Sequence, residues 1–177
     1  MKYEKNVILP SSINLVLRNA RAAEGKEVLD IFNQAHEETD FLLTYADEGT
    51  FTVEQEAEYL KDKEESSNEI EIVAVIDGKI VGTAGIESCG NKCKVRHRAE
   101  FGISIVQEYC GLGIGRRLTE ACIECAKNAG YEQIELQVVA DNERAIALYK
   151  RVGFVEFGRN PLGFKSRITG FQELIYH

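Results

Sequence analysis

No run of apolar residues in this 177-residue sequence approaches the roughly 20 residues that a helix needs to cross a bilayer. The opening segment, residues 1–10, alternates charged residues with a short apolar patch. It lacks the apolar stretch and the cleavage site of a secretory signal. From these absences we expect a cytoplasmic protein that has no membrane partner.

The sequence also lacks internal repeats, low-complexity tracts and recognisable linkers. Its length suffices for one well-packed domain and would be cramped for two. The hydrophobic fraction of 44% and the charged fraction of 28% are ordinary for a globular protein. We therefore expect residues 1–177 to form a single domain.

Cysteines are few and odd in number, which argues against a disulfide framework. Four of the five form two pairs, Cys122 with Cys125 and Cys89 with Cys93, and two such pairs can hold structural zinc. However, the first pair lies inside a helical pattern, where its spacing is also that of one buried helix face. We therefore predict cysteines that are reduced and metal-free.

Positive charge is scarce, and the net charge is −8. Residues 1–75 hold 17 acids and 7 bases, whereas residues 76–177 hold 12 acids and 14 bases. An acidic chain binds nucleic acid poorly, so we expect no nucleic-acid partner. The asymmetry permits an acidic side near a cationic substrate and a more basic side near an anionic cofactor, although acidic helices can also serve solubility alone.

Apolar periodicity and turn signals divide the chain into alternating strands and helices. After a strand at 13–18, a helix at 24–36 and a mixed segment at 37–50, a helix begins at 53 that Thr52 caps with Gln55 at the capping-box position. Predicted strands follow at 70–76, 80–88 and 95–106, then a helix at 115–129, a strand at 134–139, a helix at 142–151, and strands at 154–157 and 171–176. The three central strands should form an antiparallel meander, and the whole order predicts an α+β, or mixed α/β, fold.

Three glycines, Gly111, Gly113 and Gly115, stand between a predicted strand and a predicted helix. Such a turn aims several free backbone N–H groups and the positive end of the helix dipole at one point, which favours a phosphate or pyrophosphate group. A dinucleotide-binding turn needs G-x-G-x-x-G, but Arg116 stands where the third glycine belongs, and no Gly-Lys-Ser/Thr of a P-loop is present. Alone, the turn is a weak signal, because plain strand–helix connectors also use glycine.

A second segment, Leu136 to Phe154, closely resembles the signature of the GNAT superfamily of N-acetyltransferases. That signature is a strand, then x-x-x-N-x-x-A-x-x-L-Y, then two or three residues and G-F. The glycine turn is similar to the family's cofactor motif, [QR]-x-x-G-x-[GA], read from Cys110 to Gly115. The resemblance covers essentially the whole chain and is strongest from about residue 100 to residue 158. The matching signature residues are Asn142, Ala145, Leu148, Tyr149, Gly153 and Phe154.

The resemblance implies a central, mostly antiparallel sheet that is splayed at the cofactor site and flanked by helices. In the family, the pantetheine arm of acetyl-CoA lies between the two splayed strands, here 103–106 and 134–139. One departure is Cys110, which stands where the family has an Arg or Gln that helps to hold the pyrophosphate; Arg116 or Arg117 could supply the missing charge. The implied cofactor-binding residues are Ile103, Ile105, Cys110, Gly111, Leu112, Gly113, Ile114, Gly115, Arg116, Asn142 and Tyr149.

The family reaction is direct attack of a primary amine on the thioester of acetyl-CoA, with no metal. By resemblance, Tyr149 is the expected general acid for the leaving thiolate, although an aromatic residue on a helix also suits packing alone. Glu100 is the expected general base, and His97 or a water molecule is the alternative. Asn142 resembles a residue that contacts pantetheine and also suits the start of a helix.

The acceptor is not identified by the sequence, because fold and cofactor motif do not determine it. Candidates are a protein N-terminus, a lysine, a polyamine, an amino acid or an aminoglycoside, and the acidic N-terminal half predicts a small-molecule or peptide amine that is cationic. The family's variable acceptor loop would place Glu37, Glu38, Phe41 and Tyr45 along the substrate. A homodimer is possible. The alternatives to an enzyme are a non-catalytic acetyl-CoA-binding sensor module and, less favoured, a dinucleotide-binding oxidoreductase domain.

Overall fold

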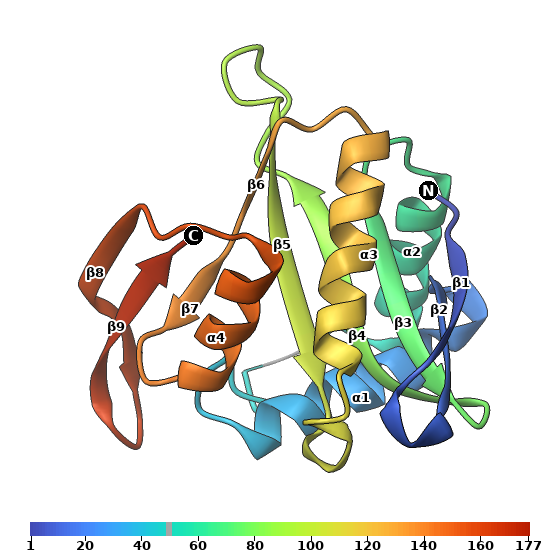
Figure 1. The fold of residues 1–177 in the computed structure, drawn as a ribbon, viewed down its shortest axis with the longest axis horizontal. Helices are drawn as coiled ribbons and strands as arrows, with labels where there is room; N and C mark the ends of the chain where they lie inside the picture. Colours follow the sequence, from blue (N-terminus) through green and yellow to red (C-terminus); the bar gives the residue numbers. More distant parts are fainter. Residues whose placement is uncertain (49–50) are drawn as a thin grey trace.

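The computed structural model describes residues 1–48 and 51–177, so the last two residues of the predicted mixed segment lie outside it. Six strands in the order β1-β2-β3-β4-β5-β6 form the large sheet, and three in the order β7-β9-β8 form a small one (Figure 1). No described helix is long and apolar enough to cross a membrane. The elements are β1 (Glu4–Ile8), β2 (Asn14–Asn19), α1 (Gly25–Glu38), α2 (Val53–Glu65), β3 (Ile70–Ile76), β4 (Lys79–Ser88), β5 (Arg98–Ile105), α3 (Ile114–Asn128), β6 (Gln133–Glu135), β7 (Gln137–Val139), α4 (Glu143–Val152), β8 (Gly158–Ser166) and β9 (Gly170–Tyr176).

The large sheet is covered on both faces. Helix α3 packs on one face against β3, β4 and β5, whereas α1 and α2 pack on the other (Figure 1). The predicted capping box of α2 is confirmed, because the Thr52 hydroxyl accepts from the Gln55 backbone N–H at 3.2 Å and the Gln55 side chain accepts from the Thr52 N–H at 2.8 Å. This cap fixes where α2 begins, and the helix borders the site described below.

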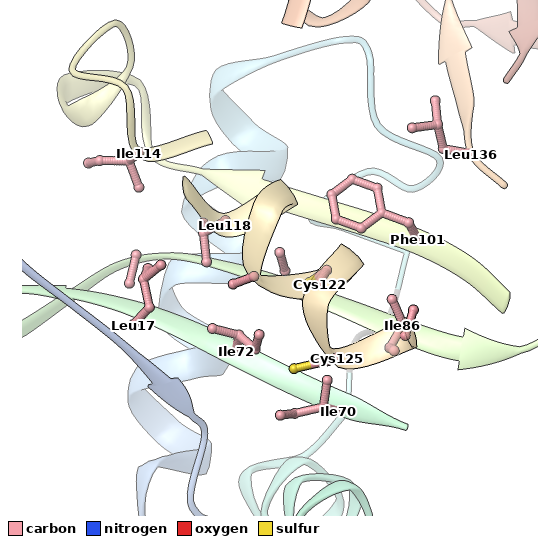
Figure 2. Packing of buried hydrophobic residues seen from close by; sticks show 14 of the residues in the cluster. Leu17, Ile70, Ile72, Ile86, Phe101, Ile114, Leu118, Cys122, Cys125 and Leu136 are labelled. Atoms are coloured by element: carbon pink, nitrogen blue, oxygen red, sulfur yellow. The ribbon is translucent and has the colours of Figure 1, made fainter. Parts of the chain in front are cut away.

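The main core lies between α3 and the sheet. Figure 2 shows Leu118, Cys122 and Cys125 of α3 directed onto Ile70 and Ile72 of β3, all almost completely buried. The expectation that the Cys122/Cys125 pair forms a buried helix face is therefore confirmed, and burial raises the pKa of the Cys122 thiol well above its usual value. The opposite face has a smaller apolar cluster of Ala20, Val28, Leu60, Val73 and Ile80.

Strand β5 has a partner on its outer edge for only part of its length. It pairs in parallel with β6 from Arg98 to Glu100, where Arg98 and Glu135 form an ion pair. After Leu136 the chain leaves the large sheet, and β7 pairs with β9 instead. We predicted one strand at 134–139; the structure has two short strands in different sheets, because the chain bends away at Leu136. Among the described residues, positions 101–105 of β5 have no strand on this edge, so the predicted α+β fold with a splayed sheet is confirmed.

The sequence analysis missed two strands of the structure and predicted one strand wrongly. Both missed strands, β1 and β8, lie at sheet edges and are largely exposed, so they lack the apolar alternation that marks a buried strand. Strand β8 even contains Pro161, which an edge position tolerates. The strand predicted at 154–157 is not a regular strand in the structure, although the Phe157 N–H donates to the Tyr176 carbonyl at 2.9 Å, and β8 begins directly after it.

Candidate active site

The glycine turn, residues 110–115, connects β5 to α3. Gly111 and Gly113 have φ angles of +90° and +91°, a backbone region that side-chain-bearing residues rarely adopt. Gly113 is the N-cap of α3, so the first backbone N–H groups of that helix have no partner within it. Ile114, which is fully buried, anchors the turn to the core. The result is a fixed set of N–H donors at the positive end of a 15-residue helix, which is a site for an anion.

Gly115 has a different role from the other two glycines of the turn. A Cβ atom at this position would lie 3.2 Å from the Leu148 side chain of α4 and 3.4 Å from the Ile105 side chain of β5. The absence of a side chain thus lets α3, α4 and β5 approach closely. Gly115 therefore sets the distance between the two helices on either side of the splay.

A third arginine lies near the glycine turn besides the two that the sequence analysis named. Arg116 and Arg117 both pair with Glu120 within α3, at 2.7 and 3.0 Å. Instead, a guanidinium nitrogen of Arg144, from α4, lies 3.4 Å from where a Cβ of Gly111 would stand. No described carboxylate forms a salt bridge with Arg144. Sequence reasoning missed it, although its position in the first turn of α4, two residues after Asn142, is a usable signal.

The two signature residues of α4 occupy distinct places. The Asn142 side chain accepts a hydrogen bond from the Ala145 N–H at 3.2 Å, so it caps α4. Tyr149 is buried, with its ring edge-on to Phe101 of β5 and to Phe154, at centroid distances of 6.2 and 5.8 Å. Burial raises the pKa of Tyr149 to about 12. The helix thus holds a neutral phenol beside β5, where the large sheet splays.

On the α1/α2 side of the sheet lies a cavity of about 690 Å³, here called the acidic cavity. Its walls are α1, α2, the segment after α1, and residues of β3, β4 and β5, including residues 101–104. None of its described lining residues is a lysine, arginine or histidine. Five glutamates line it: Glu48, Glu56, Glu71, Glu87 and Glu100. Such a cavity favours a cationic ligand.

The structure brings together some of the predicted acceptor-side residues. Glu100 is exposed and lines the acidic cavity, opposite Glu87 of β4. His97 lies before β5 starts and lines neither of the two described cavities. Of the predicted acceptor loop, Tyr45 lines both cavities. Glu37 and Glu38 line only the neighbouring cavity of about 580 Å³, and Phe41 lines neither.

Four glutamates of the acidic cavity, Glu48, Glu56, Glu71 and Glu87, were missed by the sequence analysis. Glu71 is the one charged residue in the otherwise apolar strand 70–76, a signal that could have been used. Its pKa is raised to about 7, mainly by burial and further by the carboxylates of Glu56 and Glu87. Glu56 is buried although it lies on a highly charged helix, and burial raises its pKa as well. Nothing in the sequence distinguishes Glu56 from its exposed neighbours on the same helix.

These features define a class of site. The sheet is splayed beside β5, an anion-binding turn follows the end of β5, and an acidic cavity lies on the α1/α2 face of the same strand. The acetyltransferase (GNAT) family model matches residues 27–154 of this chain. The chain therefore belongs to the GNAT acetyltransferase family.

Individual relatives agree with the family match. The chain is 35% identical over 74 residues to N-alpha-acetyltransferase 30 of Schizosaccharomyces pombe, covering 42% of this chain and 49% of that protein. It is also 35% identical over 85 residues to the L-amino acid N-acetyltransferase AaaT of Escherichia coli, covering 48% of this chain and 52% of that protein. The matched segments thus span about half the length of these curated relatives.

Solved structures extend the likeness to nearly the full chain. A GNAT-family acetyltransferase from Streptococcus pneumoniae superposes with a TM-score of 0.87 at 29% identity, covering 92% of this chain and 96% of that one. The yncA protein of Salmonella typhimurium, solved with acetyl-CoA, has a TM-score of 0.80 at 18% identity, over 92% of this chain and 91% of that one. The second likeness shows the fold alone.

Proposed function

We propose that this chain is an acetyl-CoA-dependent N-acetyltransferase that acts on a cationic primary amine, in the cytoplasm, as one domain over residues 1–177. The observation that carries the proposal is the edge of β5 at 101–105. This edge continues into the glycine turn, while residues 101–104 line the acidic cavity. A cofactor extended along the edge would place its thioester where a cation bound in the cavity can reach it.

The cofactor side of the proposed site fits acetyl-CoA by its chemistry. The N–H groups of 112–116 and the positive end of α3 suit a pyrophosphate, and Arg144 supplies the charge that Cys110 does not. The edge of β5 at Ile103 and Ile105 suits an extended arm with amide groups. Acetyl-CoA, when bound, supplies the activated acetyl group.

Tyr149 is proposed to stabilise the leaving thiolate. Because its pKa is about 12, the phenol stays neutral at physiological pH and keeps a proton to donate. A thiol ionises near pH 8.5, so full proton transfer from this phenol to the thiolate is unfavourable. We therefore assign to Tyr149 a hydrogen bond that strengthens as negative charge develops on sulfur.

Glu100 is proposed to accept the proton of the attacking amine, directly or through water. It lines the acidic cavity on the strand along which the thioester would lie, and it is exposed enough to pass a proton to solvent. His97 is less suited, because it lies before the start of β5 and does not line the cavity.

The test is release of CoA, together with the mass of the product, over a panel of amines. We expect acetylation of cationic amines, with an apparent affinity that weakens as salt is added. A protein that binds acetyl-CoA but acetylates no amine of the panel would instead be a sensor module. A strongly anionic best acceptor, unaffected by salt, would contradict the assignment of the acidic cavity.

A further inference from the structure

The five glutamates of the acidic cavity differ in how their charge is compensated. Glu87 accepts from the Lys63 ammonium at 2.9 Å and from the Tyr59 hydroxyl at 2.8 Å. Glu48 accepts from the Tyr45 backbone N–H at 2.7 Å, and Glu100 is exposed to water. Of the two remaining carboxylates, Glu71 is only partly compensated, because the Thr83 side chain and the Lys63 charge lower its pKa by less than burial raises it, and Glu56 has no partner among the described residues.

Glu56 is the clearer of these two. It is only 8% exposed, and its side chain lines the acidic cavity. Among the residues that the structure describes, none donates a hydrogen bond to its carboxylate or forms a salt bridge with it, and burial is the sole cause of its raised pKa. The Glu56 carboxylate therefore has only the cavity to face, and an ammonium group bound there would supply the partner that the protein does not.

Glu71 extends over a row of glycines. In the sheet register Glu71 of β3 pairs with Gly85 of β4, and Gly85 pairs with Gly102 of β5, so all three positions face the same side. A Cβ atom at Gly85 would collide with Oε2 of Glu71, which shows that the carboxylate lies over β4. Because neither glycine has a side chain, the surface of the sheet between this carboxylate and β5 is open.

The length of this path limits the ligand. Adjacent strands are about 4.8 Å apart, so the Glu71 carboxylate over β4 is roughly 6–8 Å from an amine that attacks at the edge of β5, a span of about four or five methylene groups. Val28, Leu29 and Phe32 of α1 line the same cavity and provide apolar walls for such a chain. Among the described residues no group of three or more side chains is placed to hold a metal ion, which favours an organic cation.

We propose that Glu56 and Glu71 form a subsite for a second ammonium group, so that the acceptor is a short aliphatic diamine or a larger amine with the same spacing of charges. This inference rests on the proposed function, because it places the reacting amine at the β5 edge. One ammonium between the two carboxylates compensates both charges at once, and the other end of the molecule reaches the thioester. An uncharged tail in place of the second ammonium leaves Glu56 without a partner and Glu71 only partly compensated.

The experiment compares 1,4-diaminobutane with n-butylamine, which has the same chain and lacks the second charge. Binding of each to the protein saturated with CoA is measured by calorimetry, so that no turnover is needed. We expect the diamine to bind at least about tenfold more tightly, since removing one partner of a desolvated charge pair is costly. Glu56→Gln and Glu71→Gln should each remove most of this difference.

Glu58→Gln is the matched control, because it removes the same charge from an exposed position of the same helix. It should keep the preference for the diamine. Equal binding of the two amines to the parent protein, or a preference that survives in Glu56→Gln, would overturn the subsite.

Single-turnover acetylation of both amines separates this subsite from a role in proton transfer. If Glu71→Gln slows both amines equally and leaves diamine binding unchanged, Glu71 is a proton acceptor and the proposed subsite is wrong. If the diamine binds through Glu56 but is never acetylated, the subsite stands and the proposed transferase activity fails.

Discussion

The two sides of β5 are built by different means. On the cofactor side, anion-binding groups are backbone N–H donors held by Gly113 and the start of α3, supported by a dense apolar core. On the acceptor side, the ligand-facing groups are side-chain carboxylates, of which Glu56 has no partner among the described residues and Glu71 is only partly compensated by Lys63 and Thr83. The comparison teaches that this chain holds its proposed cofactor by a conformation of the backbone and its proposed acceptor by charge.

The largest effect is expected where the two sides meet, at Tyr149. Tyr149→Phe removes one hydroxyl and keeps the ring that packs on Phe101 and Phe154. Acetyl-CoA binding should change little, and the single-turnover rate should fall by roughly 10²–10³-fold, the usual effect of removing one donor to a developing negative charge. Tyr176→Phe, on β9, is the control and should retain the parental rate. A near-parental rate for Tyr149→Phe would leave this residue a packing role only.

The backbone character of the cofactor side is tested by Gly113→Val. A valine at φ +91° is strained and also fills the approach to the N–H groups, so acetyl-CoA affinity should fall by about 10–100-fold. Gly130→Val separates strain from blocking, because Gly130 has a φ of +84° beyond the other end of α3 and no neighbour within 4 Å of an added Cβ. Both variants should lose stability, but only the first should lose affinity in a direct titration.

A smaller effect on acetyl-CoA affinity should distinguish Arg144 from Arg116. Arg144→Gln should weaken acetyl-CoA binding by roughly tenfold, because its guanidinium lies at the glycine turn without a described carboxylate partner. Arg116→Gln should matter less, since that side chain is paired with Glu120. Affinities measured at two salt concentrations provide the comparison. The reverse order of effects would restore Arg116 as the pyrophosphate ligand.

The smallest effect concerns stability on the acceptor side. The pKa of Glu71 is about 7 in the folded protein, above its ordinary value, so folding favours the protonated carboxyl. Its contribution is full below the ordinary pKa and is lost as pH rises toward 7. Glu56, Glu87, Lys63 and the Thr83 hydroxyl are the groups that affect this titration.

Glu71→Gln removes that pH dependence. The variant should therefore be more stable than the parent at pH 8, by about 1 kcal/mol, and nearly equal to it at pH 4.5. Denaturant unfolding at the two pH values measures this difference. A variant that is less stable than the parent at pH 8 would show that the ionised carboxylate is already compensated in the free protein.

The same contrast explains how much the sequence could predict. The glycine turn, the capped helices and the central meander were predicted, because local residue types determine them: Thr52 with Gln55, and Gly113 before α3. The edge strands β1 and β8 were missed, since exposed strands carry little apolar pattern. The break at Leu136 depends on β9, which follows far along the chain.

The acceptor side could not be predicted, because it depends on contacts between distant segments. Glu56 looks like any other acid of a charged helix until α2 is packed against the sheet. Glu71 reaches over β4 only because Gly85 stands opposite it in the register. Arg144 reaches Gly111 only because α4 returns beside the glycine turn. Each placement is a tertiary result, although Glu71 and Arg144 also carry a sequence signal that marks them as candidates.

A crystal structure of the protein with CoA and 1,4-diaminobutane would test most directly that the two substrates meet from opposite sides of β5. The account predicts the pyrophosphate on the N–H groups of 112–116, the CoA sulfur within hydrogen-bond reach of the Tyr149 hydroxyl, and one diamine nitrogen between Glu56 and Glu71. CoA bound in the acidic cavity, or a sulfur atom remote from Tyr149 and the 101–105 edge, would contradict it.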